Sequence, residues 1–180
     1  MFNRTCAVFI FDGFADHEVG LAMAWLNREC RIQTETFSHH GRTVVGTSGM
    51  RIAPHASLEE MDASEFDLLL LPGGAHWERG DNLEIFPLIR AVAGIKPILA
   101  IGSATLALAD LGLLDDIPHT SPYPGYLQQY CPEYKGSHLY QQTPYVTAGE
   151  IITANHLAMI PMAWEVQPAF GTEVHNFFEQ

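Results

Sequence analysis

The residues best suited to chemistry lie where a short apolar run turns into a helix. Residues 97–101 have the composition of a β-strand, Gly102 and Ser103 interrupt it, and residues 104–111 are helix formers with leucines on one face. In an open α/β sheet, ligands bind where the carboxyl end of a strand faces the amino terminus of a helix, and a nucleophile often occupies the bend itself. Glycine has no side chain that could attack, so any chemistry here must come from the neighbours of Gly102.

Two other stretches are expected to bring polar groups to the same sheet edge. Residues 67–71 form an apolar run that ends at a Pro-Gly-Gly turn (72–74), where two glycines can bring backbone N–H groups close to a ligand. Asp16 is the expected N-cap of a helix over residues 16–27, which places Glu18 in the first turn, near the end of the first strand. An ordinary strand-ending turn and a solvated acid are the simpler interpretations.

Ser103 and His119 offer a second kind of chemistry. The Ser103 hydroxyl could attack a substrate if a base were nearby, and His119, in a strand candidate over residues 117–121, is the candidate base. The simpler interpretation of Ser103 is a small residue that satisfies a backbone N–H at a helix start. His76 and Trp77 follow the Pro-Gly-Gly turn and are expected in the pocket wall, although an aromatic residue there is equally typical of packing.

The histidines and cysteines show neither a metal-ligand pattern nor a disulfide framework. His39, His40 and His55 are scattered without the spacing of metal ligands, so we expect no metal and no cofactor. The 3 cysteines include no CxxC pair and are too few for a disulfide scaffold. Reduced thiols are therefore the prediction.

Length and charge narrow the class of protein. At 180 residues and 47% hydrophobic, the chain fits one domain, residues 1–180, with a sizeable core. The formal net charge is −12 and no basic run is present, so nucleic-acid binding is not expected. No apolar run approaches the roughly 20 residues of a membrane span and no signal-peptide pattern opens the chain, which predicts a cytoplasmic protein without a membrane partner.

Apolar strand-like runs alternate with amphipathic helix patterns along most of the chain. Strands are expected over residues 5–11, 31–37, 67–71 and 97–101, with a small hairpin over 43–45 and 51–54. Residues 145–148 and 151–154 flank Gly149-Glu150, which predicts either a hairpin or a strand with a bulge. Helices are expected over residues 16–27, 82–93, 104–111 and 156–166, with at most a short helix over 62–66 and a helical turn or two within 123–130. The alternation predicts a parallel sheet covered by helices.

Four stretches together resemble the ThiJ/PfpI family, within the class I glutamine amidotransferase-like superfamily. They are GFADHE at 13–18, LLLPGG at 69–74, AIGSATLALADLGLL at 100–114 and HTS at 119–121. GEIITA at 149–154 and the expected helix over 156–166 extend the resemblance over residues 5 to 166. It implies a flavodoxin-like three-layer α/β sandwich, with a mostly parallel sheet, helices on both faces and, commonly, a homodimer.

The resemblance also implies roles for individual residues. In the family, a cysteine occupies the strand-to-helix bend, an acid of the first helix contacts its thiol, and two backbone N–H groups resemble an oxyanion hole. Glu18 matches the acid, Gly74 and Ser103 match the residues that supply the N–H groups, and His119 matches a position near the pocket. Family members include peptidases, glyoxalase-like and deglycase-like enzymes, isocyanide hydratases, chaperones and regulator domains, so the fold does not fix the reaction.

The chain departs from the family pattern at residue 102, where glycine stands in place of the cysteine. Without a thiolate, the cysteine chemistry of the family cannot operate at this position. The leading hypothesis is a protein that keeps the pocket and binds a small polar or anionic molecule, or serves in regulation. The alternatives are a hydrolase or lyase on small carbonyl compounds, with Ser103 or Glu18 and bound water, and a chaperone-like oligomer.

The expected site draws on the sheet edge and on both loops beside it. The candidate catalytic residues are Glu18, Ser103 and His119, and the candidate ligand-binding residues are Gly73, Gly74, Gly102, Ser103, His76 and Trp77. A small ligand is expected above residue 102, on the N–H groups of Gly74 and Ser103.

Overall fold

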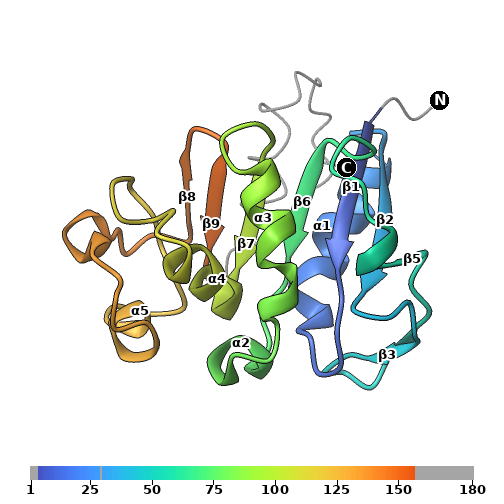
Figure 1. Cartoon of the computed structure of the whole chain (residues 1–180), viewed down its shortest axis with the longest axis horizontal. Coiled ribbons are helices and arrows are strands. Elements are labelled where there is room, and N and C mark those ends of the chain that lie inside the picture. The colour runs from blue at the N-terminus through green and yellow to red at the C-terminus, as the bar shows by residue number, and fades with distance from the viewer. Residues whose placement is uncertain (1–3, 29, 157–180) are drawn as a thin grey trace, which may run out of the picture.

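The computed structural model of the chain describes residues 4–28 and 30–156 and places most strands in one sheet (Figure 1). The strands are β1 (Arg4–Phe9), β2 (Ile32–Ser38), β3 (Val44–Val45), β4 (Arg51–Ile52), β5 (Ala56–Ser57), β6 (Leu68–Leu71), β7 (Ile98–Ile101), β8 (Tyr145–Ala148) and β9 (Ile151–Ala154). A seven-stranded sheet has the order β5-β2-β1-β6-β7-β9-β8, and β3 and β4 form a separate hairpin. Every pairing in the large sheet is parallel except that of β8 with β9.

Helices connect the parallel strands and cover both faces of the sheet. They are α1 (Asp16–Arg28), α2 (Ala75–Arg79), α3 (Phe86–Val92), α4 (Thr105–Asp110) and α5 (Tyr126–Tyr130), with 3-10 turns η1 (Leu58–Glu60), η2 (Leu83–Ile85), η3 (Gly102–Ala104) and η4 (Gly136–Leu139). The chain moves in one direction along the sheet from β1 through α1 to β2, and in the opposite direction from β6 through α3 to β7. Because parallel crossovers are right-handed, α1 and α3 lie on opposite faces (Figure 1). The result is a flavodoxin-like three-layer fold.

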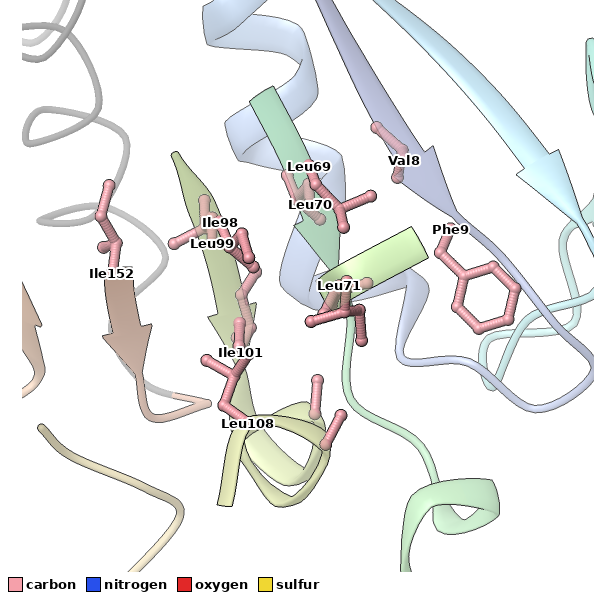
Figure 2. Packing of buried hydrophobic residues seen from close by; sticks show 14 of the residues in the cluster. Val8, Phe9, Leu69, Leu70, Leu71, Ile98, Leu99, Ile101, Leu108 and Ile152 are labelled. Atoms are coloured by element: carbon pink, nitrogen blue, oxygen red, sulfur yellow. The ribbon is translucent and has the colours of Figure 1, made fainter. Parts of the chain in front are cut away.

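The central strands form the core. Every residue of β6 and β7 is buried, which explains why both strands read as unbroken apolar runs. The register aligns Val8, Leu70, Leu99 and Ile152 in one row across four adjacent strands (Figure 2). This row fixes the strands relative to one another, so the loops that follow β1, β6 and β7 emerge at the same edge of the sheet.

Most of the expected elements are confirmed. The large strands and the hairpin around Gly149 lie within two residues or so of their expected bounds, and the expected helix over 16–27 is α1. The helix expected over 82–93 begins as η2 and continues as α3, with Pro87 in its first turn. The helix expected over 156–166 lies, apart from its first residue, outside the described residues.

One local expectation was wrong. The segment 117–121 is no sheet strand but makes a single bridge, His119 with Tyr140, whereas residues 62–66, expected to form at most a short helix, form turns. In the sheet, β9 takes the place beside β7 and β8 takes the edge, so the segment 117–121 lies outside the sheet. Helix α2 was not expected, because its five residues are too few to show a helical period.

Asp16 begins α1 but does not cap it, contrary to expectation. Its carboxylate accepts hydrogen bonds from Thr47 Oγ1 (3.1 Å), from the Ser48 backbone N–H (3.1 Å) and from the Ser48 hydroxyl. A Cβ atom on Gly46 would lie 2.2 Å from Asp16 Oδ2, so the turn over 46–50 closes tightly on the carboxylate. Asp16 therefore fastens the hairpin of β3 and β4 to the start of α1.

Candidate functional site

Glu18 is a buried carboxylic acid that joins α1 to the Pro-Gly-Gly turn after β6. Its side chain is 4% exposed, and Oε2 accepts a hydrogen bond from the Gly73 N–H at 2.8 Å. Burial raises the pKa of Glu18 above its usual value, although the Gly73 N–H and the nearby imidazoles of His17 and His156 pull this pKa down. A Cβ atom on Gly73 would lie 2.7 Å from Oε2, so only glycine permits this approach.

Gly102 lies beside the same carboxylate, at the junction of β7 and η3. It is buried and has φ +56°, in the left-handed region that favours glycine. A Cβ atom built on it would lie 2.8 Å from Glu18 Oε1. Any side chain at residue 102 would therefore be held in a strained backbone conformation next to the acid, which is the geometry of strand-to-helix bends that carry reactive side chains.

Ser103 completes the contact between the bend and the Pro-Gly-Gly turn. The Gly74 N–H donates to Ser103 Oγ (2.8 Å), and the Ser103 hydroxyl lies 3.0 Å from the Gly74 carbonyl oxygen, to which it donates. We expected the N–H groups of Gly74 and Ser103 both to be available to a ligand. The Gly74 N–H is instead already hydrogen-bonded to the Ser103 hydroxyl. The simpler interpretation of Ser103, a hydroxyl that satisfies a backbone N–H, describes this contact.

Tyr126 and Glu78 belong to this network, although the sequence reasoning did not select them. The Tyr126 hydroxyl donates to Glu78 Oε1 (2.9 Å) and also interacts with the hydroxyl of Ser103. Burial and the Glu78 carboxylate raise the pKa of Tyr126, so its hydroxyl keeps its proton. The spacing of Tyr123, Tyr126 and Tyr130 within the expected helical turn was the available signal, because it places three aromatic rings on one face.

His119 does not act on Ser103 in this structure. The ring is fully buried, Nδ1 lies 2.7 Å from the Ile117 carbonyl oxygen, and Nε2 is hydrogen-bonded to the Tyr134 hydroxyl. Because a carbonyl oxygen can only accept, we assign the proton to Nδ1, and Nε2 then accepts from Tyr134. Burial lowers the pKa of His119, which favours the neutral ring. Both nitrogens are thus engaged away from Ser103, and the expected base is not brought to it.

His76 and Trp77 do not lie with the other expected ligand-binding residues beside Gly102. Trp77 is a core residue: it packs edge-on against Phe11 with ring centroids 5.7 Å apart, and its indole N–H donates to the Pro72 carbonyl oxygen at 2.8 Å. The His76 ring packs at a tilt against the Phe11 ring, with ring centroids 5.1 Å apart, and burial lowers the pKa of His76. Trp77 supports the turn by packing, and His76 faces a different cavity, described below.

The cysteines are buried and unsuited to nucleophilic attack. Burial raises the pKa of the Cys6 thiol, and burial with the Asp110 carboxylate raises the pKa of Cys131 to about 12. Across residues 4–28 and 30–156, no group of three or more His, Cys, Asp or Glu side chains is arranged to hold a metal ion. Within the same residues, no helix is long and apolar enough to cross a membrane.

Comparison with known proteins shows the family of the chain. The sequence model of the DJ-1/PfpI family matches residues 4–166. A protein of Bacillus subtilis (strain 168) called uncharacterized protease YoaZ is 30% identical over 177 residues, which is 92% of this chain and 83% of the relative.

Two solved structures of proteins of this family have a similar fold. A thiJ/pfpI family protein from Bacillus anthracis matches with a TM-score of 0.86 and 30% identity, over 94% of this chain and 84% of that one. A DJ-1 superfamily protein from Agrobacterium tumefaciens also has a TM-score of 0.86, with 26% identity over 95% of this chain and 92% of that one.

Proposed function

The chain belongs to the DJ-1/PfpI family, and from this premise we propose that it is a member that keeps the acid and loops of the family site but has no cysteine nucleophile. It binds a small polar or anionic molecule beside residue 102 and does not act on it through a thiol. The Bacillus subtilis relative is called a protease. Peptide cleavage by a thiol at residue 102 is not part of the proposal, because glycine supplies no attacking atom.

The observation that carries this proposal is the position of Gly102. The residue has φ +56°, and its Cβ position lies 2.8 Å from the Glu18 carboxylate. A cysteine there would have its thiol next to an acid and at the start of a helix, where reactive thiols occur. Glycine relieves the backbone strain and removes the nucleophile together, while Glu18 and Gly73 stay in contact.

The ligand chemistry follows from the polar groups beside residue 102. The Gly74 N–H now bonds to Ser103 Oγ, so a ligand oxygen would take this donor by displacing the Ser103 hydroxyl. Glu18, with its raised pKa, can keep a proton and donate it to the same oxygen. These groups favour a small carboxylate or carbonyl compound.

Attack by Ser103 is less well supported than binding. The Ser103 hydroxyl points its proton at the Gly74 carbonyl, and both nitrogens of His119 have other partners. An alkoxide would form only if a base took the proton, and no base contacts Ser103 among the described residues. Catalysis by Glu18 with water is tested by the same experiment, through product analysis.

A thermal-shift screen of small carboxylates and carbonyl compounds, followed by product analysis of every compound that binds, tests the proposal. We expect binding without product and no loss of binding after treatment with iodoacetamide. The variant Glu18→Gln should weaken binding by about fivefold to tenfold, the effect of one hydrogen bond. Turnover by the unmodified protein that iodoacetamide abolishes would contradict the proposal.

Two variants at residue 102 sharpen the test. Gly102→Cys should gain a thiol that iodoacetamide alkylates rapidly at neutral pH, because the helix start lowers the pKa of a thiol placed there. Gly102→Ala is the matched control, since it adds the same Cβ atom without sulfur. A Gly102→Cys thiol that reacts no faster than the buried native cysteines would show that residue 102 is not built as a nucleophile position.

A further inference from the structure

A second cavity lies apart from the Glu18 site, among the loops that follow β1, β2 and β6. Its volume is about 460 Å³, within the range of roughly 300–1,000 Å³ that is usual for small-molecule sites. Its lining includes Phe11, Asp12, Arg42, His76, Asp81 and Glu84. The described lining includes neither Glu18, Gly102 nor Ser103.

The position of the cavity in the sheet is one where ligands bind. The chain leaves β1 toward β2 in one direction and leaves β6 toward β7 in the other, so the order of strands reverses between β1 and β6. Open α/β sheets bind ligands in the crevice outside the carboxyl ends of the strands at this reversal. The approach of Gly74 to Phe11, whose ring would lie 2.7 Å from a Cβ atom on that glycine, packs the loops after β1 and β6 together beside this cavity.

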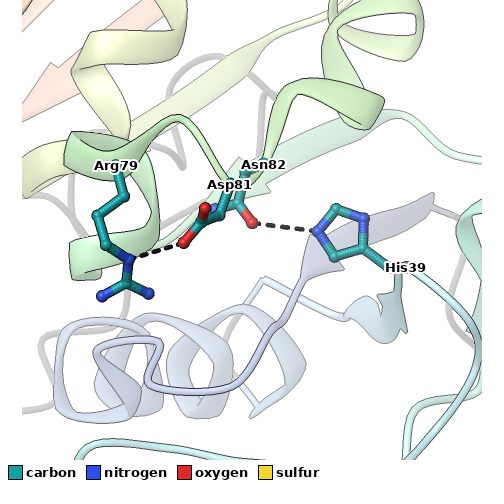
Figure 3. Close-up of polar contacts among 4 residues, drawn as sticks. All are labelled: His39, Arg79, Asp81 and Asn82. Carbon is teal, nitrogen blue, oxygen red and sulfur yellow. Dashed lines mark hydrogen bonds and ion pairs between the residues drawn. The ribbon is translucent and has the colours of Figure 1, made fainter.

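The cavity wall is fixed before any ligand binds. Asn82 is 1% exposed, and its Oδ1 lies 3.1 Å from His39 Nε2, which donates to it (Figure 3). Arg79 Nε donates to Asp81 Oδ2 at 2.7 Å in the same segment (Figure 3). The His39–Asn82 bond joins the chain after α2 to the end of β2, and the Arg79–Asp81 contact holds the segment after α2 locally.

Three carboxylates from two segments of the chain line this cavity: Asp12 follows β1, and Asp81 and Glu84 follow α2. Asp12 Oδ1 accepts the Val45 N–H at 2.9 Å, Asp81 is paired with Arg79, and Glu84 lies 3.7 Å from His39. Each acid therefore keeps an oxygen for a further donor. Negative charge from the lining exceeds the positive charge of its one guanidinium, which favours a positively charged amine.

Arg42 supplies the opposite charge on the loop between β2 and β3. It is exposed, and within residues 4–28 and 30–156 no carboxylate forms an ion pair with it. A guanidinium in this state matches a ligand carboxylate. His76 is half-buried and packs against the buried Phe11 ring, with ring centroids 5.1 Å apart, so His76 adds aromatic surface to the wall.

We propose that this cavity binds a small zwitterion, an α-amino acid with an aromatic or apolar side chain. Its ammonium group contacts Asp12, Asp81 and Glu84, its carboxylate contacts Arg42, and its side chain packs against His76. The site is independent of the proposed function beside Gly102.

Calorimetric titration with L-phenylalanine and two fragments of it tests the proposal. 2-Phenylethylamine lacks the carboxylate, and 3-phenylpropanoate lacks the amine. We expect L-phenylalanine to bind and each fragment to bind about fivefold more weakly, the upper range for one solvent-screened ion pair. Equal affinity for all three compounds, or no binding by L-phenylalanine, would overturn the proposal.

Variants assign the two charges and separate the two sites. Arg42→Gln should weaken binding of L-phenylalanine about fivefold and leave 2-phenylethylamine unaffected, whereas Asp81→Asn should weaken both. Circular dichroism melts confirm that each variant is folded. Glu18→Gln should leave L-phenylalanine binding unchanged, and Arg42→Gln should leave ligand binding beside Gly102 unchanged. If Glu18→Gln abolishes L-phenylalanine binding and Arg42→Gln does not change it, the compound binds at the other site and the inference is wrong.

Discussion

Asp16 and Glu18 are two buried carboxylates in the first turn of one helix, and their surroundings shift their pKa values in opposite directions. Their side chains are 2% and 4% exposed, so both lose nearly all contact with water. Burial would raise the pKa of Asp16, but the hydroxyl and N–H of Ser48, with Thr47 and the His17 N–H, outweigh it and hold this pKa below its usual value. Burial dominates at Glu18 and raises its pKa.

The number of donors explains the difference. Asp16 accepts hydrogen bonds from both hydroxyls of the turn and from a backbone N–H, whereas Glu18 has one described donor, the Gly73 N–H. A buried carboxylate with several donors is stable as an anion, and one with a single donor favours its protonated form. Asp16 therefore serves the structure, and Glu18 is left with capacity for a ligand or a neighbouring side chain.

The largest effect should come from removing the well-satisfied acid. Asp16→Ala should destabilise the protein by about 2–3 kcal/mol, because it leaves the donors of the turn over 46–50 without an acceptor. Urea denaturation measures this change. Asp16→Asn is the control that keeps one acceptor oxygen and should cost less. A loss below about 0.5 kcal/mol, as for an ordinary surface substitution, would show that Asp16 does not anchor the turn.

Crowding Glu18 from the other side should have the next largest effect. Gly102→Ala should destabilise the protein by about 1–2 kcal/mol, because alanine is strained at φ +56° and its Cβ displaces the Glu18 carboxylate. Gly80→Ala is the matched control, since Gly80 has φ +73° and open space around its Cβ position. If the two variants lose equal stability, the contact between residue 102 and Glu18 adds nothing to backbone strain.

A smaller effect should follow from removing one donor of Asp16. Ser48→Ala should cost about 1 kcal/mol and move the pKa of Asp16 up toward its usual value. The stability that Asp16 contributes is present above the unfolded-state pKa and is lost as the pH falls through the lower folded-state pKa. Ser48→Ala should therefore lose less stability on acidification than the natural protein does. Equal acid sensitivity in thermal melts from pH 7 to pH 2 would contradict the assignment.

The smallest expected change in stability comes from Glu18→Gln, and it is the one predicted increase. The raised pKa of Glu18 means that the unfolded chain ionises first as the pH rises, so the folded state binds more protons and loses stability between the unfolded-state and folded-state pKa. Glu18→Gln removes this loss. The variant should melt higher than the natural protein at pH 7, and the difference should disappear at acidic pH, below the unfolded-state pKa. A variant that melts lower at pH 7 would mean that ionised Glu18 is stabilised after all.

The sheet and its order of elements could be predicted from the sequence because the signals are local. Buried parallel strands such as β6 and β7 are unbroken apolar runs, and Gly102 and the Pro-Gly-Gly turn mark where these strands end. The family motifs then placed Glu18 near the bend, and the structure brings Glu18, Gly73 and Gly102 into contact. The short helix α2 and the place of residues 117–121 could not be predicted in this way, since their conformation depends on the neighbours they pack against.

What the sequence by itself determined is therefore the fold and the absence of a side chain at residue 102. Only the tertiary structure decided which polar groups have partners, because hydrogen bonds between distant segments leave no periodic trace in the chain. Asp16 bonds to a turn thirty or so positions away instead of capping its own helix, the Ser103 hydroxyl occupies the Gly74 N–H, and His119 faces Tyr134 rather than Ser103. Glu18 and Gly102 form the centre of the candidate site because these other groups are already satisfied.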